Sequence, residues 1–121
     1  MPAPTITNHP GGAQTVRLAT WVLTDADATG TPLGPDWADY ADRCFQSTGT
    51  IGTATIVLQG SNDGTNWQTL TSPAGSTITG TALSMRQVVE NPLYVRPILT
   101  GAGGSTVTCT LACKRPTLGR T

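Results

Sequence analysis

The sequence is poor in charged residues and in long apolar runs. Seven Lys and Arg balance seven Asp and Glu, and together they make up 12% of the 121 residues, about half of the usual share of roughly 25%. A chain without net positive charge lacks the basic surface of a nucleic-acid binder. No apolar run approaches the roughly 18 residues of a transmembrane helix, and no basic segment followed by an apolar stretch marks a signal peptide. We therefore expect neither a nucleic acid nor a membrane as a partner.

Side chains that carry out catalysis or hold metals are equally scarce. The only histidine, His9, is far in sequence from any partner, whereas a nucleophile needs a base within hydrogen-bonding reach. One remote histidine and three cysteines form no recognisable zinc cluster. The acids within residues 25–42 have no apolar pocket to raise a pKa, and residues 101–104 lack the lysine and the helix of a phosphate loop. The sequence predicts a protein that is not an enzyme and uses no cofactor or metal.

Cysteine occurs in an odd number, which argues against a disulfide scaffold. Cys109 and Cys113 lie four residues apart in a predicted strand, so they are about 13 Å apart and too far to bridge each other. Cys44 can meet only one of them. We expect three reduced and mostly buried thiols, as in a protein synthesised in a reducing cytoplasm.

Threonine is abundant, with 23 residues, and is accompanied by 14 Gly and 9 Pro. Threonine is β-branched and suits strands, whereas Gly and Pro favour turns. We therefore expect an all-β fold, a jelly-roll-like β-sandwich of seven or eight strands. The predicted strands cover residues 14–24, 43–48, 54–59, 66–71, 83–90, 93–99 and 106–113.

The first and last of these strands carry the clearest patterns. Between Leu18 and Leu23 both faces are apolar, so this strand is either central in the sandwich or covered by a partner. Residues 106–113 alternate, with Val107, Cys109 and every second residue after them on one face and mostly threonine on the other.

Two tight reversals are predicted between strands. Asn-Asp-Gly within residues 60–65 supplies the positive-φ positions of a hairpin turn. A second hairpin is expected to pair residues 83–90 with 93–99 around Asn91-Pro92. Pro97 has no N–H for a ladder hydrogen bond, which indicates an edge strand or a bulge.

The sandwich domain is expected to cover residues 13–113, between two terminal segments. Residues 1–12 contain three prolines and end in two glycines, which predicts an extended N-terminal arm outside the compact domain. Residues 114–121 form a short basic tail. Within the domain, Trp37 and Tyr40 have helical spacing, which predicts one short helical turn.

The segment around Asp63 has two functional interpretations beside the structural one. Asp63 is its only carboxylate, whereas protein calcium sites gather several oxygen ligands. Trp67 follows the turn, and its ring could stack on a sugar, although a Trp that opens a hairpin strand is more often part of the core. A sugar contact at Trp67 is an alternative.

Two segments follow a recognisable order of elements: ATIVLQGSNDGTNWQTL (54–70) and LSMRQVVENPLYVRPILTGAGGSTVTCTL (83–111). A strand leads to a GSNDG turn and a Trp-bearing strand. An E-N-P turn, an aromatic-x-R-P strand, a glycine-rich tip and an alternating strand come later. This order resembles small structural proteins of tailed bacteriophages over residues 43–113. The resemblance implies a capsid decoration (cement) protein, a β-sandwich that binds the outside of the phage head and braces neighbouring capsid subunits.

This role implies the major capsid protein as a partner, self-association into a trimer or dimer, and a place on the outer surface of the capsid after synthesis in the bacterial host cytoplasm. An extended arm can make contacts across a subunit seam and so tie two capsid proteins together. The expected contact residues are Pro4, Ile6 and His9 in the arm, Trp37 and Tyr40 in the short turn, and Lys114, Arg115 and Arg120 in the tail.

A second resemblance concerns GSNDGTNW and LYVRP, which are similar to segments of discoidin-type, galactose-binding-like sandwiches. It supports the jelly roll more than it supports sugar binding. The alternative functions are a carbohydrate-binding module on the virion and a tail or head–tail connector component.

Overall fold

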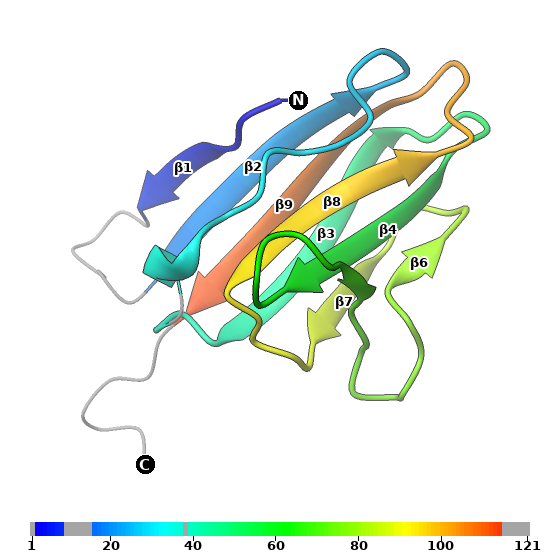
Figure 1. Ribbon diagram of the computed structural model, residues 1–121. Coiled ribbons are helices and arrows are strands. Elements are labelled where there is room, and N and C mark those ends of the chain that lie inside the picture. The colour runs from blue at the N-terminus through cyan, green and yellow to red at the C-terminus, as the bar shows by residue number, and fades with distance from the viewer. Residues whose placement is uncertain (1, 9–15, 38, 115–121) are drawn as a thin grey trace.

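The computed structural model describes residues 2–8, 16–37 and 39–114, which form nine strands and one short helix (Figure 1). The helix η1 (Pro35–Trp37) is a single 3-10 turn. The predicted all-β sandwich is confirmed. The described residues form nine strands instead of the predicted seven or eight, because residues 5–8 and 79–80 also pair as strands. The strands are β1 (Thr5–Asn8), β2 (Val16–Thr24), β3 (Asp42–Thr50), β4 (Thr55–Ser61), β5 (Gln68–Thr69), β6 (Thr79–Gly80), β7 (Met85–Val88), β8 (Tyr94–Thr100) and β9 (Thr106–Lys114).

The strands form two antiparallel sheets that lie face to face (Figure 1). The first sheet has the order β1-β2-β9-β3-β7. In the second, β4 lies between β8 on one side and the short β5 and β6 on the other. Residues 28–33 run beside β8 through the bridges Thr29–Ile98 and Leu33–Val95. This arrangement is that of a jelly roll, as predicted.

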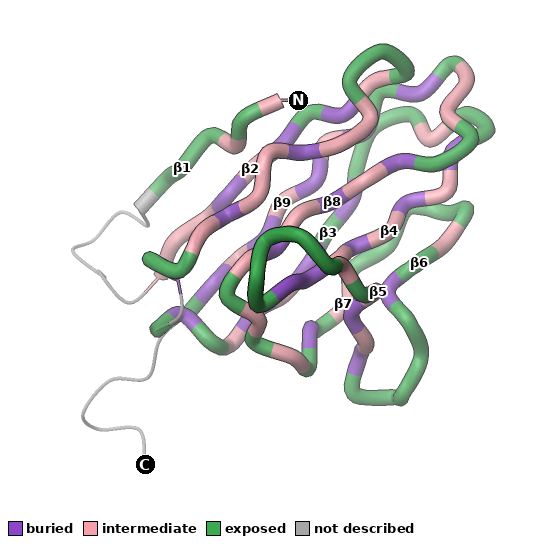
Figure 2. The backbone as a smooth tube through the Cα atoms, viewed as in Figure 1, coloured by how far each residue is buried: buried purple, intermediate pink, exposed green. Residues whose placement is uncertain are grey.

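Alternation along the strands builds the core between the sheets (Figure 2). The face of β9 that carries Val107 and Cys109 is buried, as the sequence predicted. Trp21 of β2 joins it in the first sheet, and Leu58 and Val95 come from the second sheet; all three are almost completely buried. The core is continuous from one sheet to the other.

The predicted hairpin around Asn91-Pro92 is wrong. The strand before this turn, β7, pairs with β3 in the first sheet, whereas the strand after it, β8, pairs with β4 in the second. Residues 89–93 therefore cross from one sheet to the other. The reason is burial: Val88 and Val95 both point into the core, but from opposite sheets.

Pro97 lies on the side of β8 that no named strand pairs, but this side is not the free edge that the sequence predicted, because residues 28–33 hydrogen-bond to it. β8 has β4 on one side and only residues 28–33 on the other. The N–H groups of Val95 and Leu99 donate to Leu33 and Ala28 on that outer side. Pro97 lies between these two residues, so the N–H that proline lacks is one that would point to the same side. The Pro97 carbonyl accepts a hydrogen bond from Gly30 N at 2.9 Å.

The N-terminal arm is extended as predicted, but residues 5–8 do not lie outside the domain. They form β1, which pairs with β2 from Thr5–Thr20 to Asn8–Arg17. A further hydrogen bond joins Thr31 N to the Pro2 carbonyl. The physical reason is the open edge of β2, whose backbone groups are paired by an extended segment. The rest of the predicted arm, and the tail after residue 114, lie outside the described residues.

Candidate functional site

The first sheet has one face against the core and one face turned away from it, which we call the outer face. None of its side chains in β2, β3, β7 and β9 is buried, so no described element covers it. It consists of Val16, Leu18, Thr20, Val22, Thr24, Asp42, Cys44, Gln46, Thr48, Thr50, Met85, Gln87, Thr106, Thr108, Thr110, Ala112 and Lys114.

Hydroxyl and methyl groups dominate the outer face. The strand register sets its threonines side by side, in the row Thr24-Thr106-Thr50 and in the pairs Thr20-Thr110 and Thr108-Thr48. Only Asp42 and Lys114 are charged, and they are neighbours in the register at one end of the face. Most of the face therefore carries no charge. The sequence signals for it were the threonines at every second position of 106–110 and the apolar residues on both sides of β2.

Trp37 and Tyr40, predicted as surface contacts, belong instead to the core. They are only 6% and 5% exposed, and their ring centroids lie 5.9 Å apart. The guanidinium of Arg17 lies over both rings, 4.8 Å from the Tyr40 centroid. The short turn was predicted correctly from their spacing, but it points both rings inward to close one end of the sandwich. These side chains have little surface left for a partner.

Arg43 is a buried cation beside this aromatic pair. Its Nε donates to the Tyr40 carbonyl and its Nη2 to the Trp37 carbonyl, both at 2.9 Å. Its Nη1 is buried and has no hydrogen-bond partner among the described residues. Desolvation lowers the pKa of Arg43. Arg43 therefore ties η1 to β3 and is not accessible to a ligand.

The other predicted contact residues have different positions. Ile6 on β1 is 47% exposed, Pro4 is half-buried, and Lys114 is exposed at the end of β9. His9, Arg115 and Arg120 lie outside the described residues. Ile6 pairs with the buried Ala19, so it lies on the inner side of the first sheet at its β1 edge, whereas Lys114 lies at one end of the outer face. Both remain predicted contacts.

The three cysteines are unpaired. Cys109 and Cys113 point into the core, where burial raises the pKa of Cys109 to about 12 and that of Cys113 to about 11. Such thiols stay protonated and unreactive at neutral pH. Cys44 is half-buried on the outer face, so the sheet separates it from the other two.

Asp63 organises the turn after β4. Its carboxylate accepts hydrogen bonds from Thr65 N, Asn66 N and Asn66 Nδ2, each at 2.8 Å, and from Ser61 Oγ. These bonds lower the pKa of Asp63 far below its ordinary value. The carboxylate thus replaces backbone partners in a tight turn, which is the structural interpretation of this segment.

Trp67 has a partner within the chain. The guanidinium of Arg96 lies over its ring, 4.1 Å from the centroid, and Arg96 Nε also donates to Gln59 Oε1. One face of the ring is therefore occupied by a cation–π contact. This leaves less of the ring for the predicted sugar contact.

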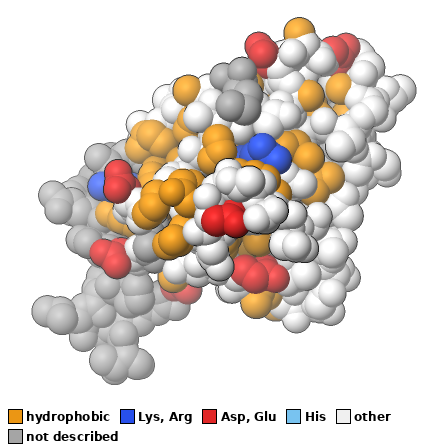
Figure 3. Space-filling model, viewed as in Figure 1, with side chains coloured by type: hydrophobic (Ala, Val, Ile, Leu, Met, Phe, Trp, Pro, Cys, Tyr) orange, Lys and Arg blue, Asp and Glu red, His pale blue; other side chains and the backbone are white. Residues whose placement is uncertain are grey.

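Neither metal ligands nor a membrane span emerge from the part of the chain that the structure describes. No three His, Cys, Asp or Glu side chains there gather into a group that could hold a metal ion. No helix formed by these residues is long and apolar enough to cross a membrane. On the face seen in Figure 3, acidic groups lie at several separate places and form no continuous region.

No family model matches the chain, and no curated protein matches it. Among solved structures, it is similar to the K1 cleaved adhesin domain of Lys-gingipain from Porphyromonas gingivalis W83. The two share 12% sequence identity over 96% of this chain and 85% of that chain, with a TM-score of 0.42.

Proposed function

We propose that this protein is a capsid decoration protein of a tailed bacteriophage, a non-enzymatic module that binds the outside of the head and braces neighbouring major capsid subunits. The observation that carries the proposal is the outer face, a sheet surface of hydroxyl and methyl groups that no described element covers and that is charged only at one end. The order of elements over residues 43–113, which resembles such proteins, supports it separately.

The chemistry of the outer face favours attachment to another protein. Withdrawing threonine and backbone from water costs less than withdrawing Lys or Glu. The three nine-residue strands β2, β9 and β3, with the four-residue edge strands β1 and β7 beside them, give a face of roughly 550 Å². This is less than the roughly 800 Å² per partner of a standard interface. A single copy would bind weakly, and linked copies on a repeating lattice would gain affinity through avidity.

The proposal therefore includes a homo-oligomer, a trimer or a dimer. β1 and β7 are the two edges of the first sheet, and edge strands offer backbone groups for pairing with another chain. Exposed apolar side chains accompany both edges, Ile6 at β1 and Leu83, Met85 and Val89 at β7. Contacts between these edges would leave the outer face open toward the capsid.

The test is co-sedimentation of the purified full chain with phage heads that lack it. Thr20→Glu together with Thr48→Glu places two charges on the outer face without filling the core. We expect at least about tenfold weaker binding, equivalent to 1.4 kcal/mol. The matched control is Ser76→Glu with Thr81→Glu, two exposed positions away from this face, which should bind like the wild type.

Equal binding by both double variants would remove the outer face from the proposal, provided that circular dichroism shows both to be folded. The number of copies per particle gives a second criterion. Hundreds of copies are expected for a decoration protein, whereas tens would favour a head–tail connector.

A further inference from the structure

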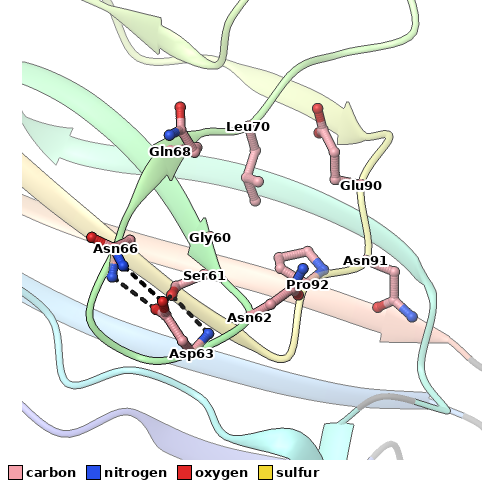
Figure 4. A pocket seen from close by; sticks show the side chains of 10 residues that line it. All are labelled: Gly60, Ser61, Asn62, Asp63, Asn66, Gln68, Leu70, Glu90, Asn91 and Pro92. Carbon is pink, nitrogen blue, oxygen red and sulfur yellow. Dashed lines mark hydrogen bonds between the residues drawn. The ribbon is translucent and has the colours of Figure 1, made fainter.

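A pocket of about 410 Å³ lies on the second sheet, between the β4–β5 turn and the segment that crosses between the sheets (Figure 4). Residues 60–70 form one wall and residues 90–92 the other. Its volume falls within the range of roughly 300–1,000 Å³ typical of small-ligand pockets. Because it belongs to the second sheet, a ligand there would not compete with a partner on the outer face.

The base of the pocket is apolar. Figure 4 shows Leu70 pointing into its middle, with Pro92 on the opposite wall. A Cβ on Gly60 would lie 2.4 Å from Pro92 Cγ and 2.7 Å from Leu70 Cδ2, so only glycine lets both groups close over β4. Leu70 is only 3% exposed, so the aliphatic carbon that a ligand can reach belongs mainly to the half-buried Pro92.

Amide side chains surround this base. Asn62 Oδ1 accepts from Leu93 N, which leaves the Nδ2 group as a donor. Asn66 Nδ2 donates to Asp63 Oδ2, which leaves Asn66 Oδ1 as an acceptor. Gln68 is exposed, and its amide has no hydrogen-bond partner among the described residues. The rim therefore presents both donors and acceptors on uncharged groups.

The two carboxylates of the pocket are already engaged. The carboxylate of Asp63 accepts hydrogen bonds from Ser61, Thr65 and Asn66 within its own turn. The two carboxylate oxygens of Glu90 accept hydrogen bonds from Thr71 N and Thr71 Oγ1. Burial alone would raise the pKa of Glu90, but these bonds outweigh it and lower the pKa. Both groups are therefore anionic at neutral pH, and no Lys or Arg is among the lining residues. Phosphate and other anionic ligands are repelled.

We propose that this pocket binds an uncharged sugar ring. A pyranose has a C–H face that fits the half-buried ring of Pro92. Its hydroxyl groups both donate and accept, as the exposed amides of Asn62, Asn66 and Gln68 require. The site differs from the sugar contact predicted at Trp67, because Trp67 is not among the lining residues. It also goes beyond attachment to a capsid, since it assigns a small-molecule ligand to the opposite layer.

The test is an NMR titration of the ¹⁵N-labelled full chain with the methyl glycosides of glucose, galactose, mannose and N-acetylglucosamine. Concentrations up to about 50 mM suffice for a dissociation constant near 1 mM. We expect at least one glycoside to shift the amide signals of Gly60, Asn62, Gln68 and Leu70. Inorganic phosphate at the same concentration should leave these signals unchanged.

Two variants test the proposed contacts. Gln68→Ala removes an exposed side chain that makes no hydrogen bond among the described residues, and Asn62→Asp keeps the acceptor for Leu93 N while replacing the free donor. Each should weaken binding at least about fivefold, a loss in the range of one hydrogen bond. Gln87→Ala, an exposed amide on the other sheet, is the matched control and should bind like the wild type.

The proposal is overturned if none of the four glycosides shifts the pocket signals, if the shifts centre on Trp67 and Arg96, or if phosphate binds the pocket more tightly than the sugars. It is also overturned if both pocket variants bind like the wild type. Head binding is measured separately, so failure of sugar binding and failure of the proposed capsid role are distinguishable.

Discussion

Gly30 lies directly against the indole ring of Trp21. A Cβ at Gly30 would be 2.8 Å from Trp21 Cδ1 and 2.9 Å from Pro97 Cδ, and the indole N–H donates to the Thr31 carbonyl at 2.9 Å. Trp21 is the largest fully buried side chain, and residue 30 must be glycine to leave room for its ring. This contact fixes residues 28–33 beside β8 and completes the second layer.

Gly30→Ala should destabilise the protein by about 1–3 kcal/mol, because the added methyl overpacks a rigid contact between two rings. Gly34→Ala is the matched control: a Cβ there meets nothing within 4 Å, so its effect should stay within about 0.5 kcal/mol. Equilibrium denaturation in guanidinium measures both. Similar stabilities of the two variants would contradict the close packing of Gly30 on Trp21.

Arg43→Lys should cost about 1.5–3 kcal/mol in the free energy of unfolding. The guanidinium reaches two carbonyls at once, those of Trp37 and Tyr40, and a lysine ammonium lacks the fork needed for both. The comparison is Arg86→Lys, which changes one exposed hydrogen bond to the Thr77 carbonyl and should alter stability by less than about 0.5 kcal/mol. If Arg43→Lys proves neutral, Arg43 does not tie η1 to β3.

The carboxyl of Asp63 should titrate well below its ordinary pKa of about 4. Because the folded pKa is depressed, Asp63 stabilises the fold fully above pH of about 4, and this contribution is lost as the pH falls through the folded pKa. Carboxyl ¹³C NMR measures the titration. Asn66→Ala should raise the pKa of Asp63, because it removes the donor Nδ2. Asn62→Ala should leave that pKa unchanged, because the Asn62 amide accepts from Leu93 N and does not contact the carboxylate through a hydrogen bond. A wild-type pKa near 4 would contradict the hydrogen-bonded turn.

Thiol reagents should modify the native protein at Cys44 alone. Cys109 and Cys113 are buried and their pKa values are raised, whereas Cys44 is half-buried on the outer face. Mass spectrometry should show one modified thiol under native conditions and three in denaturant. Equal native labelling of two or more cysteines would contradict the assignment of Cys44 to the outer face and of Cys109 and Cys113 to the core.

A bulky maleimide on Cys44 should also block binding to phage heads. The variant Cys44→Ser, treated with the same maleimide, should bind normally.

Local patterns predicted the parts of the fold that local physics controls. Strict alternation predicted the buried face of β9. The missing N–H of Pro97 predicted the side of β8 that no named strand pairs, but it did not predict residues 28–33 beside it. The Asn91-Pro92 turn shows the limit of this approach. A turn has the same sequence pattern whether the strand after it joins the sheet of the strand before it or the opposite sheet. Only the burial of Val88 and Val95 from two sides decides between them.

Surface sites were harder to predict than the fold. Trp37 and Tyr40 were predicted as contacts from their place in a surface turn, but both side chains are buried at one end of the sandwich. The outer face depends on the register of four strands, β2, β3, β7 and β9, which are distant in the sequence. The pocket joins residues 60–70 to 90–92 only because the chain crosses between the sheets, so no local motif could reveal it.

The central position of β9 has a consequence for biosynthesis. β9 pairs along its length with β2 and with β3, both of which are made much earlier. Until residues 106–114 have been translated, these two strands have no common neighbour, and their inner edges are open to other chains. The first sheet must therefore assemble late in synthesis. A nascent chain stalled or cut before β9 would be a natural target for chaperones and would aggregate without them.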